Sequence, residues 1–168
     1  MKAVAVDLDG ALGDTRPLWR DFLADAARRY AAIAPLDPTS LPEDRGAAAA
    51  ELDLWAEGSV GDWRAALARF AEERAPVYLR PSADASAALR ALEAAGVRIG
   101  VFTDAPEELA LVALAQLGAA RRVAALESGT QALERLLSRL GSETPVVAGR
   151  EDLLRFSAGD LGDPTSAG

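Results

Sequence analysis

The sequence contains neither cysteine nor histidine, and Lys2 is its only lysine. The lack of cysteine excludes disulfides, cysteine nucleophiles and thiolate metal sites. The lack of histidine excludes a histidine general base, a Ser-His-Asp triad and imidazole metal ligands. A single lysine beside the N-terminus also excludes Schiff-base chemistry and the lysine of a P-loop. Carboxylates, hydroxyls, arginines, backbone amides and a metal held by oxygen remain. This set suits phosphoryl or acyl transfer at an aspartate with Mg²⁺.

Aromatic residues and net positive charge are also scarce. Aromatics make up 5% of the 168 residues, and the formal net charge is −8. An acidic chain lacks the basic face that nucleic acids and anionic membranes require, so we expect neither as a partner. The first apolar run is too short for a signal peptide or a membrane span, which makes a cytoplasmic location the expectation. The length fits one domain with at most a small appendage.

Short apolar runs alternate with helical patterns over much of the chain. Four of these runs fit buried strands, at residues 2–6, 97–102, 122–126 and 144–148. Helices are expected between them, beginning near Ser82, Pro106 and Thr130 and ending at Gly96, Gly118 and Gly141. This alternation predicts an α/β fold with a parallel sheet of about four strands flanked by helices.

The stretch from residue 17 to 80 holds helical patterns and no convincing strand. Apolar residues keep helical spacing over residues 19–33, starting at Trp19 and ending at Ile33. The same spacing recurs over residues 63–70, directly behind Asp62, which can cap a helix. A proline-containing loop separates the two patterns, so we expect a helical insert here.

These patterns divide the chain into two parts. Residues 1–16 and 81–168 are expected to form the α/β core, and residues 17–80 the helical insert. The insert therefore interrupts the core after the first strand. The residues from Gly159 onward are rich in Gly, Asp and Ser, which predicts a frayed tail.

Two aspartates, Asp7 and Asp9, follow the first strand. Both are expected at the carboxyl end of that strand, where ligands bind in open α/β sheets. Gly10 allows a sharp turn that brings backbone amides close to an anion. The simpler alternative is an ordinary turn after a strand. Two close carboxylates repel each other unless they share a cation, which favours a site over a turn.

The string from Val4 to Thr15 resembles the first motif of the haloacid dehalogenase-like (HAD) superfamily, Asp-x-Asp-Gly-Thr/Val-Leu-x-Asp-Ser/Thr. It matches at Asp7, Asp9, Gly10, Leu12, Asp14 and Thr15, and it departs at Ala11. The stretch Ile99–Asp104 is similar to the second motif, a hydrophobic strand that ends in Thr or Ser. The resemblance covers roughly residues 2–155. It implies a Rossmann-like core, with the helical insert as a small cap like that of many phosphatases in the superfamily.

The resemblance also implies roles for individual residues. Asp7 would be the nucleophile that forms an aspartyl-phosphate, and Asp9 would protonate the leaving alkoxide and then activate water. The Asp7 carboxylate and the Asp9 carbonyl would hold Mg²⁺. Thr103, the amide of Asp104 and the turn at Gly10 would bind the phosphoryl group of a small phosphomonoester. On local grounds alone, Thr103 could instead cap the helix that begins near Pro106.

The later motifs of the superfamily are incomplete in this sequence. The third motif supplies a lysine, less often an arginine, and residues 127–130 contain no basic residue. The fourth motif normally reads Gly-Asp, but here Arg150 follows Gly149. Glu151 or Asp152 could then reach the metal, with Asp152 as the expected third ligand and Arg150 binding the phosphate through its fork.

Two functions therefore remain open at this point. One is a Mg²⁺-dependent phosphatase of a small phosphorylated metabolite. The other is a catalytically degenerate protein of the same fold that binds a phosphorylated ligand or a protein partner, in which the residues from Arg150 simply begin a helix. The dehalogenase branch of the superfamily is disfavoured, because its members use a single nucleophilic aspartate and this chain keeps Asp9.

Overall fold

Four parallel strands form a single sheet in the order β3-β2-β1-β4. The computed structural model describes residues 2–159. Within them the strands are β1 (Ala3–Asp7), β2 (Arg98–Thr103), β3 (Val123–Ser128) and β4 (Val146–Val147). The predicted α/β class and the four predicted strands are confirmed. The predicted tail from Gly159 lies, apart from its first residue, outside the described part of the chain.

Strand β1 lies in the middle of the sheet because its side chains are apolar on both faces. Val4, Ala5 and Val6 are fully buried. Val4 and Val6 face one apolar cluster, whereas Ala5 packs on the opposite face against Leu136. Burial on both faces is typical of strands in a parallel sheet covered by helices on each side. This position holds the end of β1, and therefore Asp7, firmly in place.

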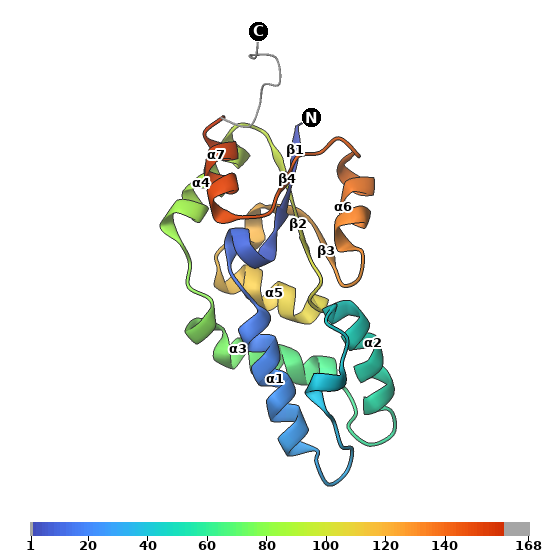
Figure 1. Cartoon of the computed structure of the whole chain (residues 1–168). Helices are drawn as coiled ribbons and strands as arrows, with labels where there is room; N and C mark the ends of the chain where they lie inside the picture. Colours follow the sequence, from blue (N-terminus) through green and yellow to red (C-terminus); the bar gives the residue numbers. More distant parts are fainter. Residues whose placement is uncertain (1, 160–168) are drawn as a thin grey trace.

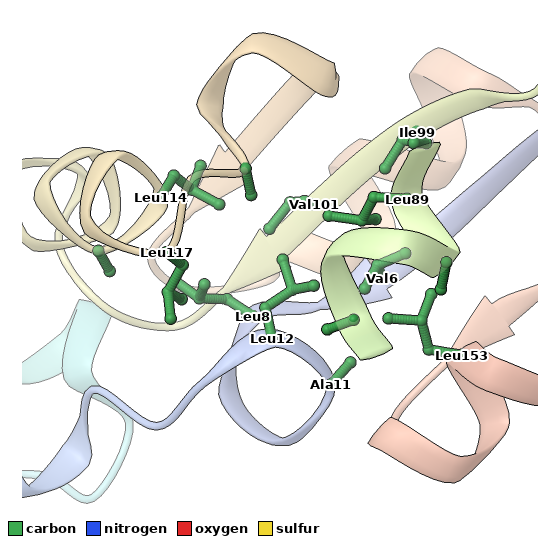
Figure 2. Packing of buried hydrophobic residues seen from close by; sticks show 14 of the residues in the cluster. Val6, Leu8, Ala11, Leu12, Leu89, Ile99, Val101, Leu114, Leu117 and Leu153 are labelled. Atoms are coloured by element: carbon green, nitrogen blue, oxygen red, sulfur yellow. The ribbon is translucent and has the colours of Figure 1, made fainter. Parts of the chain in front are cut away.

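Helices cover both faces of the sheet (Figure 1). The larger cluster joins the sheet to α4 (Ala83–Ala94), α5 (Glu107–Gln116) and α7 (Arg150–Ser157), and Figure 2 shows some of its side chains. Helix α6 (Ala132–Leu140) covers the other face. The predicted helix signals are confirmed where the Ser82 hydroxyl accepts from the Ala85 amide and where Gly96 adopts a φ of 74°.

Three further helices form the helical insert between β1 and β2. They are α1 (Arg16–Arg29), α2 (Arg45–Ala56) and α3 (Trp63–Tyr78), and they lie beyond the carboxyl ends of the strands (Figure 1). Their shared cluster includes Phe22, Leu52 and Leu67, together with Ala105 and Leu109 from the core. The predicted cap at Asp62 is confirmed, because its carboxylate accepts from the Ala65 amide.

Two details of the insert differ from the sequence prediction. Helix α1 ends at Arg29, and Ile33 is 65% exposed, so the periodicity to Ile33 overstates the helix by one turn. The sequence does not predict helix α2, because its first turns are built from Gly and Ala and show no periodic pattern of large apolar residues. It forms because Asp44 caps its first turn and because small residues pack closely.

No helix within residues 2–159 has both the length and the apolar character needed to cross a membrane.

Candidate active site

Asp7 is the last residue of β1 and opens onto a cleft between the sheet and the insert. Its Oδ1 accepts a hydrogen bond from the Asp9 amide at 3.0 Å. Its Oδ2 has no hydrogen-bond donor among residues 2–159. Burial, together with the nearby charges of Asp9 and Asp104, raises the pKa of Asp7 to about 6, although the Asp9 amide opposes the shift. The carboxylate is therefore ionised at neutral pH and has one oxygen free to react.

Gly10 allows the tight loop that turns the chain back after Asp7. Its φ is 119°, and an added Cβ would lie 2.8 Å from the Ala148 carbonyl oxygen, so only glycine fits. The Gly10 amide donates to the Gly13 carbonyl at 2.8 Å. The predicted turn is present, but its amide is already used within the loop and does not face an anion.

Asp9 is held by four hydrogen bonds. Its Oδ1 accepts from the Thr15 amide at 2.8 Å and from the Thr15 hydroxyl at 2.7 Å. Its Oδ2 accepts from the Thr103 hydroxyl at 2.7 Å and from Arg45 Nη2 at 2.6 Å. Burial alone would raise the pKa of Asp9, but the Arg45 charge and the hydrogen bonds outweigh burial and lower it. Asp9 is therefore kept ionised.

Thr103 brings the end of β2 to the same point. Its side chain is buried, and its hydroxyl donates to Asp9 while accepting from the Ala105 amide at 3.2 Å. It thus contacts Asp9 and stabilises the turn before α5, although α5 itself begins behind Pro106 without a side-chain cap. Binding of a phosphoryl group by Thr103 stays a prediction. Asp104, the next residue, points its carboxylate toward the insert.

Arg45, the first residue of α2, is a candidate site residue that the sequence analysis did not identify. Its Nε and Nη2 lie 2.9 and 2.7 Å from Asp104 Oδ1, and its amide donates to Asp104 Oδ2 at 3.1 Å. The same guanidinium contacts Asp9 and donates to the Thr15 hydroxyl at 2.7 Å, and Arg45 is only 4% exposed. A positive charge from the insert therefore fills the place between two carboxylates of the core.

The residues beside Arg45 hold the start of α2 against the core. The Thr130 hydroxyl donates to Asp44 Oδ2 at 2.6 Å. A Cβ on Gly46 would lie only 2.2 Å from the Thr130 amide nitrogen, so glycine is needed for this close approach. The sequence does carry a weak signal, since Arg45 is the only basic residue between Arg29 and Arg64 and follows a capping aspartate.

Arg150 has other partners than the predicted phosphate. Its Nε donates to the Ala11 carbonyl at 2.6 Å, and its Nη2 donates to the Leu12 carbonyl at 3.1 Å. The side chain lies under the loop that follows β1, and it is not among the residues that line the cleft. The structure therefore places Arg150 as a support of the loop, which corrects the sequence prediction.

The predicted metal ligands do not come together. Asp152 pairs with Arg155 at 2.6 Å instead of reaching Asp7 and Asp9, and the neighbouring Glu151 is exposed. Across residues 2–159 no group of three or more His, Cys, Asp or Glu side chains could hold a metal ion. Arg150 stands where the fourth motif places a carboxylate. The residues present therefore keep the Asp7 carboxylate and the Asp9 carbonyl of the implied Mg²⁺ site, but neither Asp152 nor Glu151 lines the cleft as its third ligand, so the described residues do not fit the complete site.

The cleft has a volume of about 1120 Å³, which is enough for a small metabolite. Its charged lining consists of seven carboxylates and three arginines, namely Asp7, Asp9, Asp14, Glu43, Asp44, Asp104, Glu134, Arg16, Arg20 and Arg45. Arg16 and Arg20 are exposed, and Arg16 is paired with Asp14 at 2.8 Å. Arg45 is therefore the one buried cation of this lining.

The amino-acid sequence matches the family described as haloacid dehalogenase-like hydrolase over residues 1–149. No curated protein matches the chain.

Solved structures share the fold at low sequence identity. CbbY from Rhodobacter sphaeroides in complex with phosphate is 16% identical with a TM-score of 0.59, covering 95% of this chain and 83% of that one. A variant of CbbY in complex with xylulose-(1,5)-bisphosphate is 16% identical with a TM-score of 0.60, covering 88% and 76%. A HAD phosphatase from Thermococcus onnurineus is 20% identical with a TM-score of 0.54, covering 96% and 83%. At these identities the likeness shows the fold.

Proposed function

The chain belongs to the haloacid dehalogenase-like hydrolases, and on that premise we propose that it hydrolyses small phosphomonoesters through an aspartyl-phosphate on Asp7. One observation carries the proposal. Asp7 ends the central strand with one carboxylate oxygen held by the Asp9 amide and the other facing a metabolite-sized cleft. A fixed carboxylate with a free oxygen is the arrangement that nucleophilic catalysis requires. Two of the similar structures were solved in complex with phosphate or with a sugar bisphosphate, which makes a phosphomonoester the first ligand to test.

The reaction would proceed in two steps. Asp7 Oδ2 attacks phosphorus, the bond from phosphorus to the ester oxygen breaks, and the alcohol leaves with a proton. Water then attacks the aspartyl-phosphate, releases phosphate and restores the Asp7 carboxylate. Asp9 is the group placed for the proton transfers. Because Asp9 is ionised at rest, it must first take up a proton from solvent, which it then passes to the leaving oxygen. In its ionised form it can accept a proton of the attacking water.

The helical insert would act as the cap of this site. Its helix α2 reaches the core through Arg45, which contacts Asp9 and Asp104 at the wall of the cleft. Closure of a cap excludes water and completes a catalytic site. No step above depends on a metal, because the third ligand of the implied Mg²⁺ site is missing from the cleft.

The test is phosphate release from a panel of small phosphomonoesters, measured in MgCl₂ and in EDTA. The wild type should release phosphate from at least one member, and Asp7→Asn should release none. Asn preserves the size of the side chain and removes the nucleophilic oxygen. Halide release from a 2-haloacid, with no phosphate release from the panel, would instead indicate dehalogenase chemistry.

A second function is ligand binding without turnover. It is favoured by one specific observation: the buried Arg45 forms salt bridges with both Asp9 and Asp104. In that case a phosphorylated compound would bind to the wild type and to Asp7→Asn alike, and neither protein would release phosphate. The same panel, with binding followed by calorimetry, separates the two functions.

A further inference from the structure

A phosphate group that enters this cleft meets an unfavourable electrostatic field. The charged lining has seven carboxylates against three arginines. A phosphate dianion beside Asp7 would be repelled strongly unless a cation stood next to it. In the superfamily pattern this positive charge comes from a lysine together with a metal ion. Among the described residues, no lysine lines the cleft and no cluster of His, Cys, Asp or Glu side chains could hold a metal ion.

Arginines of the core near the strand ends are committed to other partners. Arg150 donates to the carbonyls of Ala11 and Leu12. Arg135, which follows β3, donates to the carbonyls of Ser128 and Thr130 and pairs with Glu127. Both hold loops through backbone carbonyls, and neither lines the cleft.

Arg45 differs from these arginines in position and in partners. Its guanidinium lies between Asp9 and Asp104, within 3.4 Å of the Thr103 hydroxyl. Asp104 is the weaker anchor of the two, since its side chain is 40% exposed whereas that of Asp9 is 9% exposed. Asp104 can therefore turn into solvent and release the Nε and Nη2 fork, which matches the geometry of a phosphate as well as that of a carboxylate.

We infer that Arg45, delivered by the helical insert, is the cation that binds an anionic phosphate ligand here, and that this ligand binds without a divalent metal ion. The ligand replaces Asp104 as the partner of the guanidinium. This inference rests on the proposed function, because that function brings a phosphate to Asp7. The docking of α2 onto Thr130 fixes where the guanidinium stands, so the insert and the core form the site together.

The experiment is calorimetric titration with inorganic phosphate, in EDTA and in MgCl₂. The wild type should bind phosphate with the same affinity in both buffers. Arg45→Gln should weaken binding at least about tenfold, because a charge-assisted fork is lost. Asp104→Asn should bind phosphate more tightly than the wild type, because the competing carboxylate is gone. Arg64→Gln is the matched control and should bind like the wild type, since Arg64 pairs with Asp53 and Glu108 away from this cleft.

Three results would overturn the inference: phosphate binding that requires Mg²⁺, no phosphate binding in either buffer, or an Arg45→Gln variant that binds like the wild type. Should Arg45→Gln fail to fold, Asp104→Asn still decides. If Asp104→Asn bound phosphate no more tightly than the wild type, the claim that phosphate replaces Asp104 as the partner of Arg45 would be wrong.

Failure of this inference is distinguishable from failure of the proposed function. Turnover that occurs only with Mg²⁺ would leave the phosphatase in place and remove the metal-free role of Arg45. Phosphate binding in EDTA that depends on Arg45, without turnover of any phosphomonoester, would leave this inference in place and remove the phosphatase.

Discussion

Asp7 is ionised at neutral pH at a cost to folding. Its folded-state pKa of about 6 exceeds the ordinary value of 3.8, so the folded protein binds this proton more tightly than the unfolded chain. The resulting contribution to stability is fully present below about pH 4 and is lost as the pH rises through about 6.

Asp7→Asn should therefore change stability in a pH-dependent manner. Above pH 7 the variant should be more stable than the wild type by about 1 kcal/mol, a value reduced for the solvent-exposed part of the side chain. Below about pH 4 the two proteins should have equal stability. Urea unfolding across this pH range measures the difference, and a difference that does not change with pH would contradict the raised pKa.

Arg150 should matter for stability and little for ligand binding. Arg150→Met removes two hydrogen bonds from a charged donor to the carbonyls of Ala11 and Leu12. The free energy of unfolding should fall by about 2 kcal/mol, because both carbonyls lose a charged partner.

The matched control for this variant is Arg155→Met, which breaks only an exposed pair with Asp152 and should cost less than about 0.5 kcal/mol. Phosphate titration of both variants completes the test. An Arg150→Met protein of unchanged stability that no longer binds phosphate would restore the phosphate-binding role predicted from the sequence.

At the level of single residues, the sequence predicted the part of the site that is local. Asp7, Asp9 and Thr103 each follow an apolar strand, and parallel strands bring such positions to one edge. Arg45 could not be found in this way, because it begins a helix of the insert and does not end a strand of the sheet, so only the fold brings it to Asp9 and Asp104. The prediction that Arg150 binds the phosphate is wrong, because a position in a motif does not determine the direction of a side chain. In the structure that side chain turns to the carbonyls of Ala11 and Leu12.

Among the elements, the start of α2 is the piece that joins the insert to the site. Gly46→Ala should displace it, because the new Cβ would lie 2.2 Å from the Thr130 amide nitrogen. We expect a loss of stability of about 2 kcal/mol, within the range for overpacked contacts. We also expect weaker phosphate binding, even though every charge of the site is kept.

Gly149→Ala is the matched control, since its Cβ would meet nothing closer than the Asp152 carboxylate at 4.0 Å. It should leave both stability and phosphate affinity close to the wild-type values. If Gly46→Ala behaved in the same way, the contact between α2 and the loop after β3 would not position Arg45.

The strands were predictable because each is a continuous apolar run, which a buried parallel strand requires. Helices with strong ends, such as α4 behind Ser82, were predictable for the same local reason. Helix α2 was not, because residues 46–50 are Gly and Ala and show no face of large apolar side chains. Its place is fixed by contacts with the core, which no local pattern contains.

For the whole molecule, α5 connects the two apolar clusters. Leu109 packs in the cluster of the insert, whereas Leu114 and Leu117 of the same segment pack under the sheet. A shared helix predicts that the insert and the core unfold in one transition.

Leu109→Ala should lower the unfolding free energy by about 2–5 kcal/mol. Tryptophan fluorescence, which reports on the insert because Trp19, Trp55 and Trp63 all lie there, should shift together with far-ultraviolet circular dichroism. Leu111→Ala, at a position 53% exposed, should change little. Separate midpoints for the two probes would contradict coupling through α5.

The central claim is that Asp7 receives a phosphoryl group in a cleft whose cation comes from the insert. The most direct measurement is mass spectrometry of the protein after acid quenching during turnover of an active phosphomonoester. The account predicts one added phosphoryl group on the peptide that contains Asp7, absent in Asp7→Asn and strongly reduced in Arg45→Gln. Turnover without phosphorylation of that peptide, or equal labelling of the Asp7→Asn protein, would contradict it.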